Sequence, residues 1–210
     1  GDAARRRFAV ARALELHEQA LSLASGNALE SGRALAALGD DQESAYHGDE
    51  AFEAYLPALE LLRGEPGADS LRAHICLMAS RMAAVKWGGF RSKPTPELWD
   101  SLVDEGLAAA RDDETHAWLT VLKGNIGVRR MRLRVDDPLS LDERLQFAEA
   151  GVEAAERLDR PAVLSQSYRT SALLRSLAGD WDRTLELARR DIRLADRLAS
   201  LPSADRDAAG

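Results

Sequence analysis

Apolar residues recur every three or four positions along almost the whole chain of 210 residues. This spacing places them on one face of a helix, and short segments of Gly, Pro and Asp interrupt it. The pattern predicts about nine helices, at residues 7–25, 28–46, 49–63, 69–87, 96–111, 114–134, 140–158, 161–178 and 181–199. Alanine and leucine dominate the apolar residues while valine and isoleucine are few, so the composition excludes a β-rich or α/β fold. We therefore predict an all-α protein.

Several helix boundaries carry recognisable capping residues. Gly179 and Asp180 supply a C-terminal glycine and then an N-cap for the next helix. Thr95 is an N-cap followed by proline at the first helical position. Ser140 and Glu143 have the spacing of a capping box.

An internal repeat connects the predicted helices. The helix at 140–158 carries an apolar stripe of Leu141, Leu145, Ala148, Val152, Ala155 and Leu158. Forty residues later the same steps are taken by Trp181, Leu185, Ala188, Ile192, Ala195 and Leu198. Trp99, Val103, Gly106 and Ala110 follow the same rhythm, as do Ala51, Tyr55, Ala58 and Leu62. A small central residue lets a neighbouring helix approach closely. The end helices of the array, at 7–25 and 181–199, are expected to be unshielded.

The period of the repeat favours a solenoid. First helices of successive pairs begin near residues 28, 69, 114 and 161, which gives a period of about 41–47 residues. In a solenoid each pair buries its apolar face only against its neighbours. A compact helical bundle is the alternative.

Residues 172–188 (ALLRSLAGDWDRTLELA) resemble a tetratricopeptide (TPR) hairpin, with the small residue, turn glycine and aromatic residue of that motif at Ala172, Gly179 and Trp181. Residues 46–59 (YHGDEAFEAYLPAL) are a weaker match, and the other pairs depart from the 34-residue spacing. The resemblance implies a right-handed, TPR-like solenoid of antiparallel helical hairpins. The chain starts with Gly rather than Met and ends on residues typical of a linker. We therefore expect residues 1–201 to be the repeat domain of a longer chain and 202–210 to be a linker or the start of a further helix.

Residues 84–97 (AVKWGGFRSKPTPE) and 112–118 (DDETHAW) are similar to the helical-repeat regions of large bacterial signalling ATPases. Those proteins include class III adenylate/guanylate cyclases and LuxR-type transcription activators. The cyclase-linked type resembles these segments most. The resemblance implies a regulatory domain in signal transduction, with any catalytic domain outside this chain.

No set of residues in the sequence indicates catalysis, a cofactor or a metal. The four histidines are scattered without metal-ligand spacing, and Cys76 lies in an apolar run that favours a buried, inert thiol. A net charge of −7 argues against direct nucleic-acid binding. No apolar run is long enough for a membrane span, and a single cysteine is typical of a cytoplasmic protein. We therefore expect no catalytic residues, no metal ligands and no cofactor.

Two features are candidates for binding. The segment from Trp87 to Pro94 combines two aromatic residues, two glycines and two cations, which is typical of a partner anchor, although Trp87 and Phe90 alternatively fill a gap between repeats. First helices at 69–87, 114–134 and 161–178 together carry a net charge of +8, and second helices at 49–63, 96–111 and 140–158 carry −9. The first helix at 28–46 is acidic and breaks this rule, so a basic stretch would start after the first full pair. This difference predicts a basic concave groove for an acidic segment, unless it is a chance distribution of solvated charges.

The leading hypothesis is a non-enzymatic protein-interaction or sensor module. It would bind an acidic peptide or an adjoining domain in the groove. The predicted partner-binding residues are Trp87, Trp118, Lys123, Arg129, Arg130, Tyr168 and Arg169. A small-molecule receptor that uses the tryptophans is one alternative. A structural scaffold that forms a homodimer through the helices at 7–25 and 181–199 is another.

Overall fold

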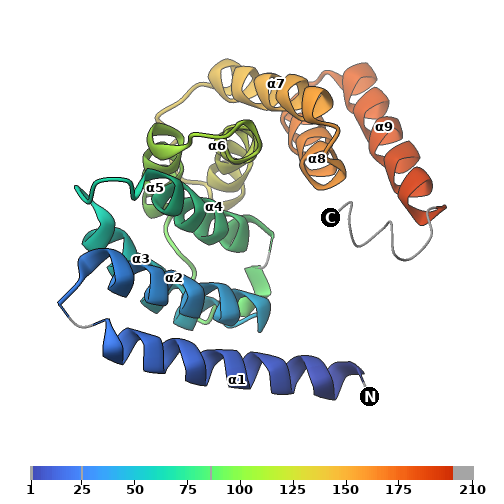
Figure 1. Ribbon diagram of the computed structural model, residues 1–210. Coiled ribbons are helices and arrows are strands. Elements are labelled where there is room, and N and C mark those ends of the chain that lie inside the picture. Colours follow the sequence, from blue (N-terminus) through green and yellow to red (C-terminus); the bar gives the residue numbers. More distant parts are fainter. Residues whose placement is uncertain (1, 25, 86, 201–210) are drawn as a thin grey trace. The chain divides into compact units, whose positions relative to one another are not determined.

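Nine α-helices and one short 3-10 helix make up the described part of the chain (Figure 1). The structure is a computed structural model and describes residues 2–24, 26–85 and 87–200. The helices are α1 (Asp2–Leu23), α2 (Ala28–Ser44), α3 (Gly48–Leu62), α4 (Asp69–Val85), α5 (Pro96–Ala109), α6 (Asp113–Leu133), α7 (Leu141–Leu158), α8 (Pro161–Leu177) and α9 (Trp181–Ala199). The 3-10 helix η1 (Trp87–Gly89) follows α4, and these residues contain no strand. The prediction of an all-helical protein with nine helices is confirmed for them.

The capping residues act as the sequence predicts. Thr95 Oγ1 accepts a hydrogen bond from the Leu98 N–H at 3.3 Å. Ser140 and Glu143 form a full capping box, in which each side chain accepts the other residue's backbone N–H. The Asp180 carboxylate caps α9, and Gly179 before it has a φ of 78°, a value that glycine adopts without strain. These local contacts fix where the helices begin.

The helices form two compact units, Gly1–Arg111 and Asp112–Gly210. The first unit contains α1–α5 and the second contains α6–α9. Each unit is described separately below. The segment 202–210, predicted as a linker or a further helix, lies outside the described residues.

In the first unit, the apolar stripe of α3 is buried as predicted. Ala51, Tyr55, Ala58 and Leu62 have no exposed surface. Glycines on α2 make room for them: a Cβ added at Gly32 would lie 2.6 Å from the Leu62 side chain. Close packing of α2 on α3 therefore depends on both the stripe and the small residues opposite it.

A carboxylate on α5 links two other helices of the first unit. Glu105 accepts hydrogen bonds from Arg63, which follows α3, and from Arg72 on α4, at 2.7 and 2.9 Å. Burial opposes ionisation of Glu105, but the two guanidinium groups outweigh it and lower the pKa of this carboxyl. The ion pairs fix α5 against its neighbours through charge as well as apolar contact.

In the second unit, α6 and α7 approach closely because of small residues. A Cβ added at Gly151 of α7 would lie 2.5 Å from Val121 Cγ2 on α6. On the same face of α7, the predicted stripe residues Leu145, Ala148 and Val152 are buried. The stripe is therefore buried in the middle of α7, whereas Leu141 at its start is 37% exposed.

A buried arginine joins the loop between α6 and α7 to both helices. Arg144 is 1% exposed and donates to both carboxylate oxygens of Asp137, at 2.6 and 3.0 Å. It also donates to the Lys123 carbonyl oxygen at 2.6 Å. Gly127 leaves space for the aliphatic part of its side chain. The charge is thus compensated where it is buried, as such groups require.

Candidate functional site

Four predicted partner-binding residues lie on α6, and three of them are buried. Trp118, Lys123 and Arg130 expose 8%, 8% and 4% of their surface. Arg130 also donates to a backbone carbonyl oxygen in the following loop at 2.8 Å. Arg129 is half-buried, and burial together with the charge of Arg132 lowers its pKa to about 10. Most of these side chains therefore belong to the packing of the second unit.

Two predicted residues, Tyr168 and Arg169, lie together on α8. The Tyr168 hydroxyl donates to Glu156 Oε1 at 3.1 Å, and burial, reinforced by this carboxylate, raises the pKa of the phenol. Arg169 is exposed and donates from Nε to Asp191 on α9 at 2.9 Å. Trp87 lies in η1, but its side chain lies outside the described residues.

The charge difference between first and second helices coincides with ion pairs between neighbouring helices. Three arginines of first helices pair with a carboxylate of a second helix: Arg72 with Glu105 (2.9 Å), Arg169 with Asp191 (2.9 Å) and Arg175 with Glu149. Such pairs place basic residues on one helix of a pair and acidic residues on the next. Part of the sequence pattern therefore reflects packing within each unit, and the acidic-segment hypothesis stays a prediction.

The groove between α6 and α7 is filled by the next helix. Leu174 of α8 is 1% exposed and forms one apolar cluster with Val128 of α6 and with Leu145 and Ala148 of α7. Three helices thus meet around one leucine. The stripe of α7 therefore packs against a large apolar side chain, Leu174, from the helix that follows.

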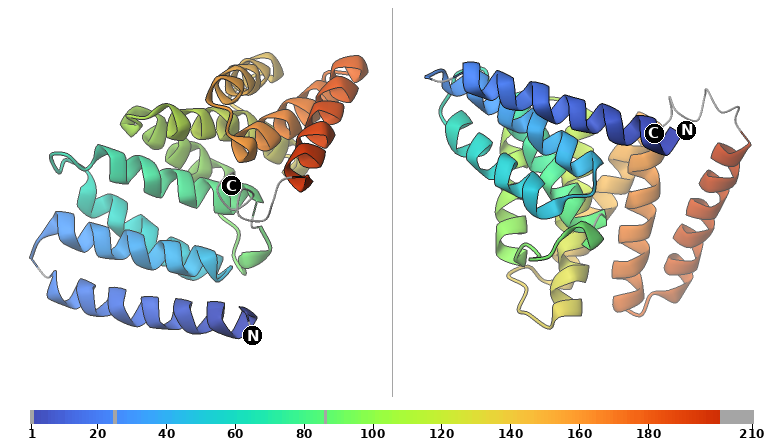
Figure 2. Two further views of the ribbon diagram at one scale, coloured as in Figure 1. Left: turned by 45° about the vertical axis from the view of Figure 1, so that its right-hand side comes forward. Right: turned by 90° about the horizontal axis from the view of Figure 1, so that it is seen from below.

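The matching stripe of α9, unlike that of α7, is exposed. Trp181, Leu185 and Ile192 expose 63%, 52% and 61% of their surface. The helix packs on α8 through a different face, that of Leu187 and Leu194. Figures 1 and 2 show α9 at the end of the second unit with α8 on one side. No other described helix of this unit covers the stripe.

An open groove of about 400 Å³ runs between α8 and α9. Its walls include Ala172 and Leu173 from α8 and Ala188 and Ile192 from α9. The pair of Arg169 and Asp191 lies in its lining, so two residues near its floor are already joined. Tyr168 and Arg169 of this groove are among the predicted partner-binding residues, whereas its apolar residues Ala172, Leu173, Ala188 and Ile192 are not.

A second groove, of about 600 Å³, lies in the first unit. Phe52 and Leu56 of α3 line it together with Phe90 and Lys93 of the loop before α5. The loop is held to α3 by Asp49, whose carboxylate accepts the backbone N–H groups of residues 91 and 92 at 2.9 and 3.2 Å. Phe90 is buried in edge contact with Phe52, so it packs against α3 of the first unit.

The described residues offer little chemistry. They contain no group of three or more His, Cys, Asp or Glu side chains that could hold a metal ion. Cys76 is fully buried as predicted, and burial raises the pKa of its thiol to about 12, which disfavours the thiolate form. Among the same residues, no helix is both long and apolar enough to cross a membrane.

Comparison with known proteins gives no further guide to the function. No protein-family model and no curated protein sequence matches the chain. The groove between α8 and α9 is therefore interpreted from its own geometry.

Proposed function

We propose that the chain is a non-enzymatic protein-interaction module, a right-handed TPR-like solenoid that binds a helix of a protein partner or of an adjoining domain in the groove between α8 and α9. The exposed stripe of Trp181, Leu185 and Ile192 carries this proposal. Exposed apolar surface of this kind, bordered by charged residues, is typical of interaction sites.

The groove filled by α8 supports the choice of a helix as the ligand. Leu174 inserts between α6 and α7 against Leu145 and Ala148. Leu185 and Ala188 repeat those two positions on α9, forty residues later. A helix that offers a leucine to α9 would reproduce a contact that this protein already makes once. Such helix-in-groove binding relies on a few apolar anchors.

In a signalling protein, binding at this end of the repeat would act by coupling. A partner helix would extend the stack by one element, and the change would reach an attached output domain through neighbouring helices. This role in a bacterial, cytoplasmic regulator is part of the proposal and rests on the sequence resemblance.

A peptide with the α8 sequence tests the proposal. The probe is a fluorescently labelled peptide of residues 161–177 with Arg175→Gln, so that the tested contact is apolar. We expect saturable binding to the whole chain, measured by fluorescence anisotropy. The variant Ile192→Glu places a charge in the groove and is expected to abolish binding.

Leu61→Glu is the matched control, because Leu61 is an apolar residue of the first unit with 38% of its surface exposed. This variant is expected to bind the peptide as the wild type does. Equal binding by wild type and Ile192→Glu, or no binding by either at millimolar peptide, would refute the proposed function.

A small-molecule receptor is the second candidate, and the groove of about 600 Å³ beside Phe52 and Phe90 favours it. Ligand pockets of this size are mostly apolar with a few polar groups, and Lys93 supplies a cation here. A thermal-shift screen distinguishes the candidates. A ligand of this groove would raise the melting temperature of the wild type but not of Leu56→Arg, in which the groove is filled.

A further inference from the structure

The charges beside the stripe differ between α7 and α9, and this difference specifies the partner. We infer that α9 selects a helix that carries a carboxylate next to its anchoring leucine, at the position where α8 carries Arg175. This inference rests on the proposed function and concerns the same groove.

The contacts of α8 with α7 supply the template. Leu174 is the apolar anchor, and the next residue, Arg175, forms an ion pair with Glu149 of α7. Seven residues before Arg175, Tyr168 donates its hydroxyl to Glu156 of α7. One leucine and two polar contacts, a helical heptad apart, therefore fix how α8 lies on α7.

On α9 the first polar position has the opposite charge. Arg189 lies forty residues after Glu149, one step from Ala188 in the groove wall. It is exposed and forms no ion pair among the described residues. An arginine of a bound helix would meet like charge there, whereas a glutamate or aspartate would form an ion pair.

The second polar position keeps its charge. Asp196 lies forty residues after Glu156, and it is exposed without an ion-pair partner in the described part of the chain. A side-chain hydrogen-bond donor on the bound helix, seven residues before its carboxylate, would donate to Asp196 as Tyr168 donates to Glu156. The partner is thus an amphipathic helix with a hydrogen-bond donor, a leucine six residues later and a carboxylate directly after the leucine.

This partner differs from α8 itself at one position. A second copy of the chain would offer Arg175, the wrong charge, even where its α8 became accessible. The sequence of α9 also lacks the required order, because its leucine that precedes a carboxylate, Leu185 before Glu186, has Gly179 rather than a side-chain donor six residues before it. The charges therefore favour a different protein segment over self-association.

Two peptides test the inference against the whole chain. Both have the sequence of residues 161–177, one with the native Arg175 and one with Arg175→Glu. We expect the glutamate peptide to bind wild type about fivefold more tightly at low salt, since an exposed ion pair replaces a like-charge contact. The chain variant Arg189→Glu is expected to reverse this preference.

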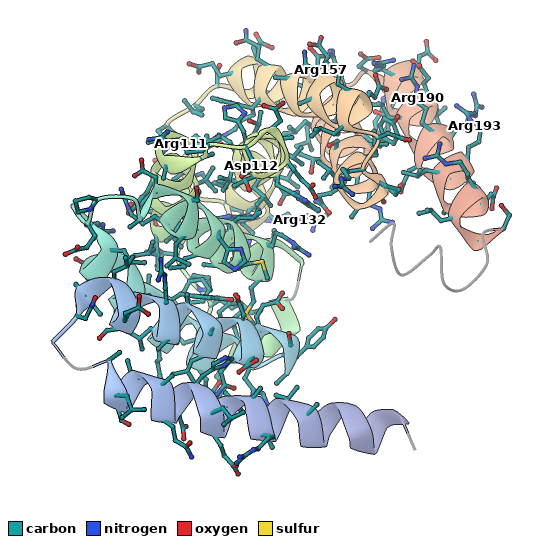
Figure 3. All side chains as sticks on the ribbon, viewed as in Figure 1. Arg111, Asp112, Arg132, Arg157, Arg190 and Arg193 are labelled. Atoms are coloured by element: carbon teal, nitrogen blue, oxygen red, sulfur yellow. The ribbon has the colours of Figure 1, made fainter. Side chains whose placement is uncertain are left out.

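Arg193→Glu is the matched control, because Arg193 is also exposed on α9 but lines a different groove, with Arg190 and Glu156. Figure 3 labels Arg190 and Arg193 on α9. It is expected to leave the preference for the glutamate peptide unchanged. A preference that 0.5 M salt does not reduce would contradict an electrostatic origin.

The outcomes separate the inference from the proposed function. If both peptides bind wild type equally and Ile192→Glu removes the binding, the charge selection is wrong and the proposed function stands. If neither these peptides nor the glutamine peptide binds, both are wrong. If sedimentation shows a dimer that Leu185→Glu dissociates, a second copy occupies the stripe and the inference is overturned.

Discussion

Helices α7 and α9 carry apolar stripes with the same spacing, but the two stripes differ in how far they are buried. In α7 the stripe is enclosed between α6 and α8, and Leu145 exposes 6% of its surface. In α9 the equivalent Leu185 exposes 52%. Identical spacing in sequence therefore leads to a core in one place and a surface in the other. In α7 the next helix, α8, covers the stripe, whereas no described helix of the second unit covers that of α9.

The largest expected effect separates the two leucines directly. Leu145→Ala removes a buried side chain and is expected to lower the free energy of unfolding by about 3 kcal/mol. Leu185→Ala changes an exposed residue at the same repeat position, and the expected loss is less than about 0.5 kcal/mol. Urea unfolding followed by circular dichroism measures both. Similar losses for the two variants would mean that the stripe of α9 is covered in solution.

The next prediction concerns how closely the helices approach. Gly151→Ala adds a Cβ that would lie 2.5 Å from Val121 Cγ2, so we expect a net loss of about 1 kcal/mol despite the better helix propensity of alanine. On α9 this repeat position is Asp191, whose side chain accepts a hydrogen bond from Ser165 of α8 at 2.6 Å. At this repeat position α7 has no room for a side chain, whereas α9 carries a carboxylate that hydrogen-bonds to α8.

The control is Gly88→Ala, because a Cβ at Gly88 meets no atom within 4 Å. We expect its urea midpoint to lie close to that of the wild type. A gain in stability for Gly151→Ala would show that α6 and α7 are further apart than described.

A charge exchange tests the template used for the partner helix. Arg175→Glu replaces the ion pair with Glu149 by a like-charge contact, and the expected loss of unfolding free energy is about 1 kcal/mol. The double variant Arg175→Glu, Glu149→Arg is expected to recover part of that loss. Urea unfolding of the two single variants and the double variant gives the coupling energy. If the coupling energy is indistinguishable from zero, Glu149 does not help to fix α8. There would then be no basis for inferring that Arg189, at the same repeat position, selects the charge of a bound helix.

The sequence predicts the helices well because their signals are local. Caps such as Ser140 with Glu143 lie within one turn, and the apolar period is set by one helix alone. The candidate site was harder to predict because it depends on contacts between helices. Nothing in the sequence around Lys123 or Arg130 shows that packing encloses them, since charged residues are ordinarily exposed. The exposure of Ile192 has no local signal either, because its stripe repeats that of α7.

The smallest effect is spectroscopic and reports on the stripe of α9 without disturbing the core. Trp181 is 63% exposed, whereas Trp99 and Trp118 are 2% and 8% exposed. The fluorescence spectrum of Trp181 is obtained by subtracting the emission of the Trp181→Phe variant from that of the wild type. We expect this difference spectrum to have a red-shifted maximum, which is typical of a hydrated indole. Adding the glutamate peptide should shift this difference spectrum to the blue, because a bound helix would exclude water from the indole. A blue-shifted maximum without peptide, at every protein concentration, would mean that Trp181 is already covered within the chain, and the contrast between α7 and α9 would then disappear.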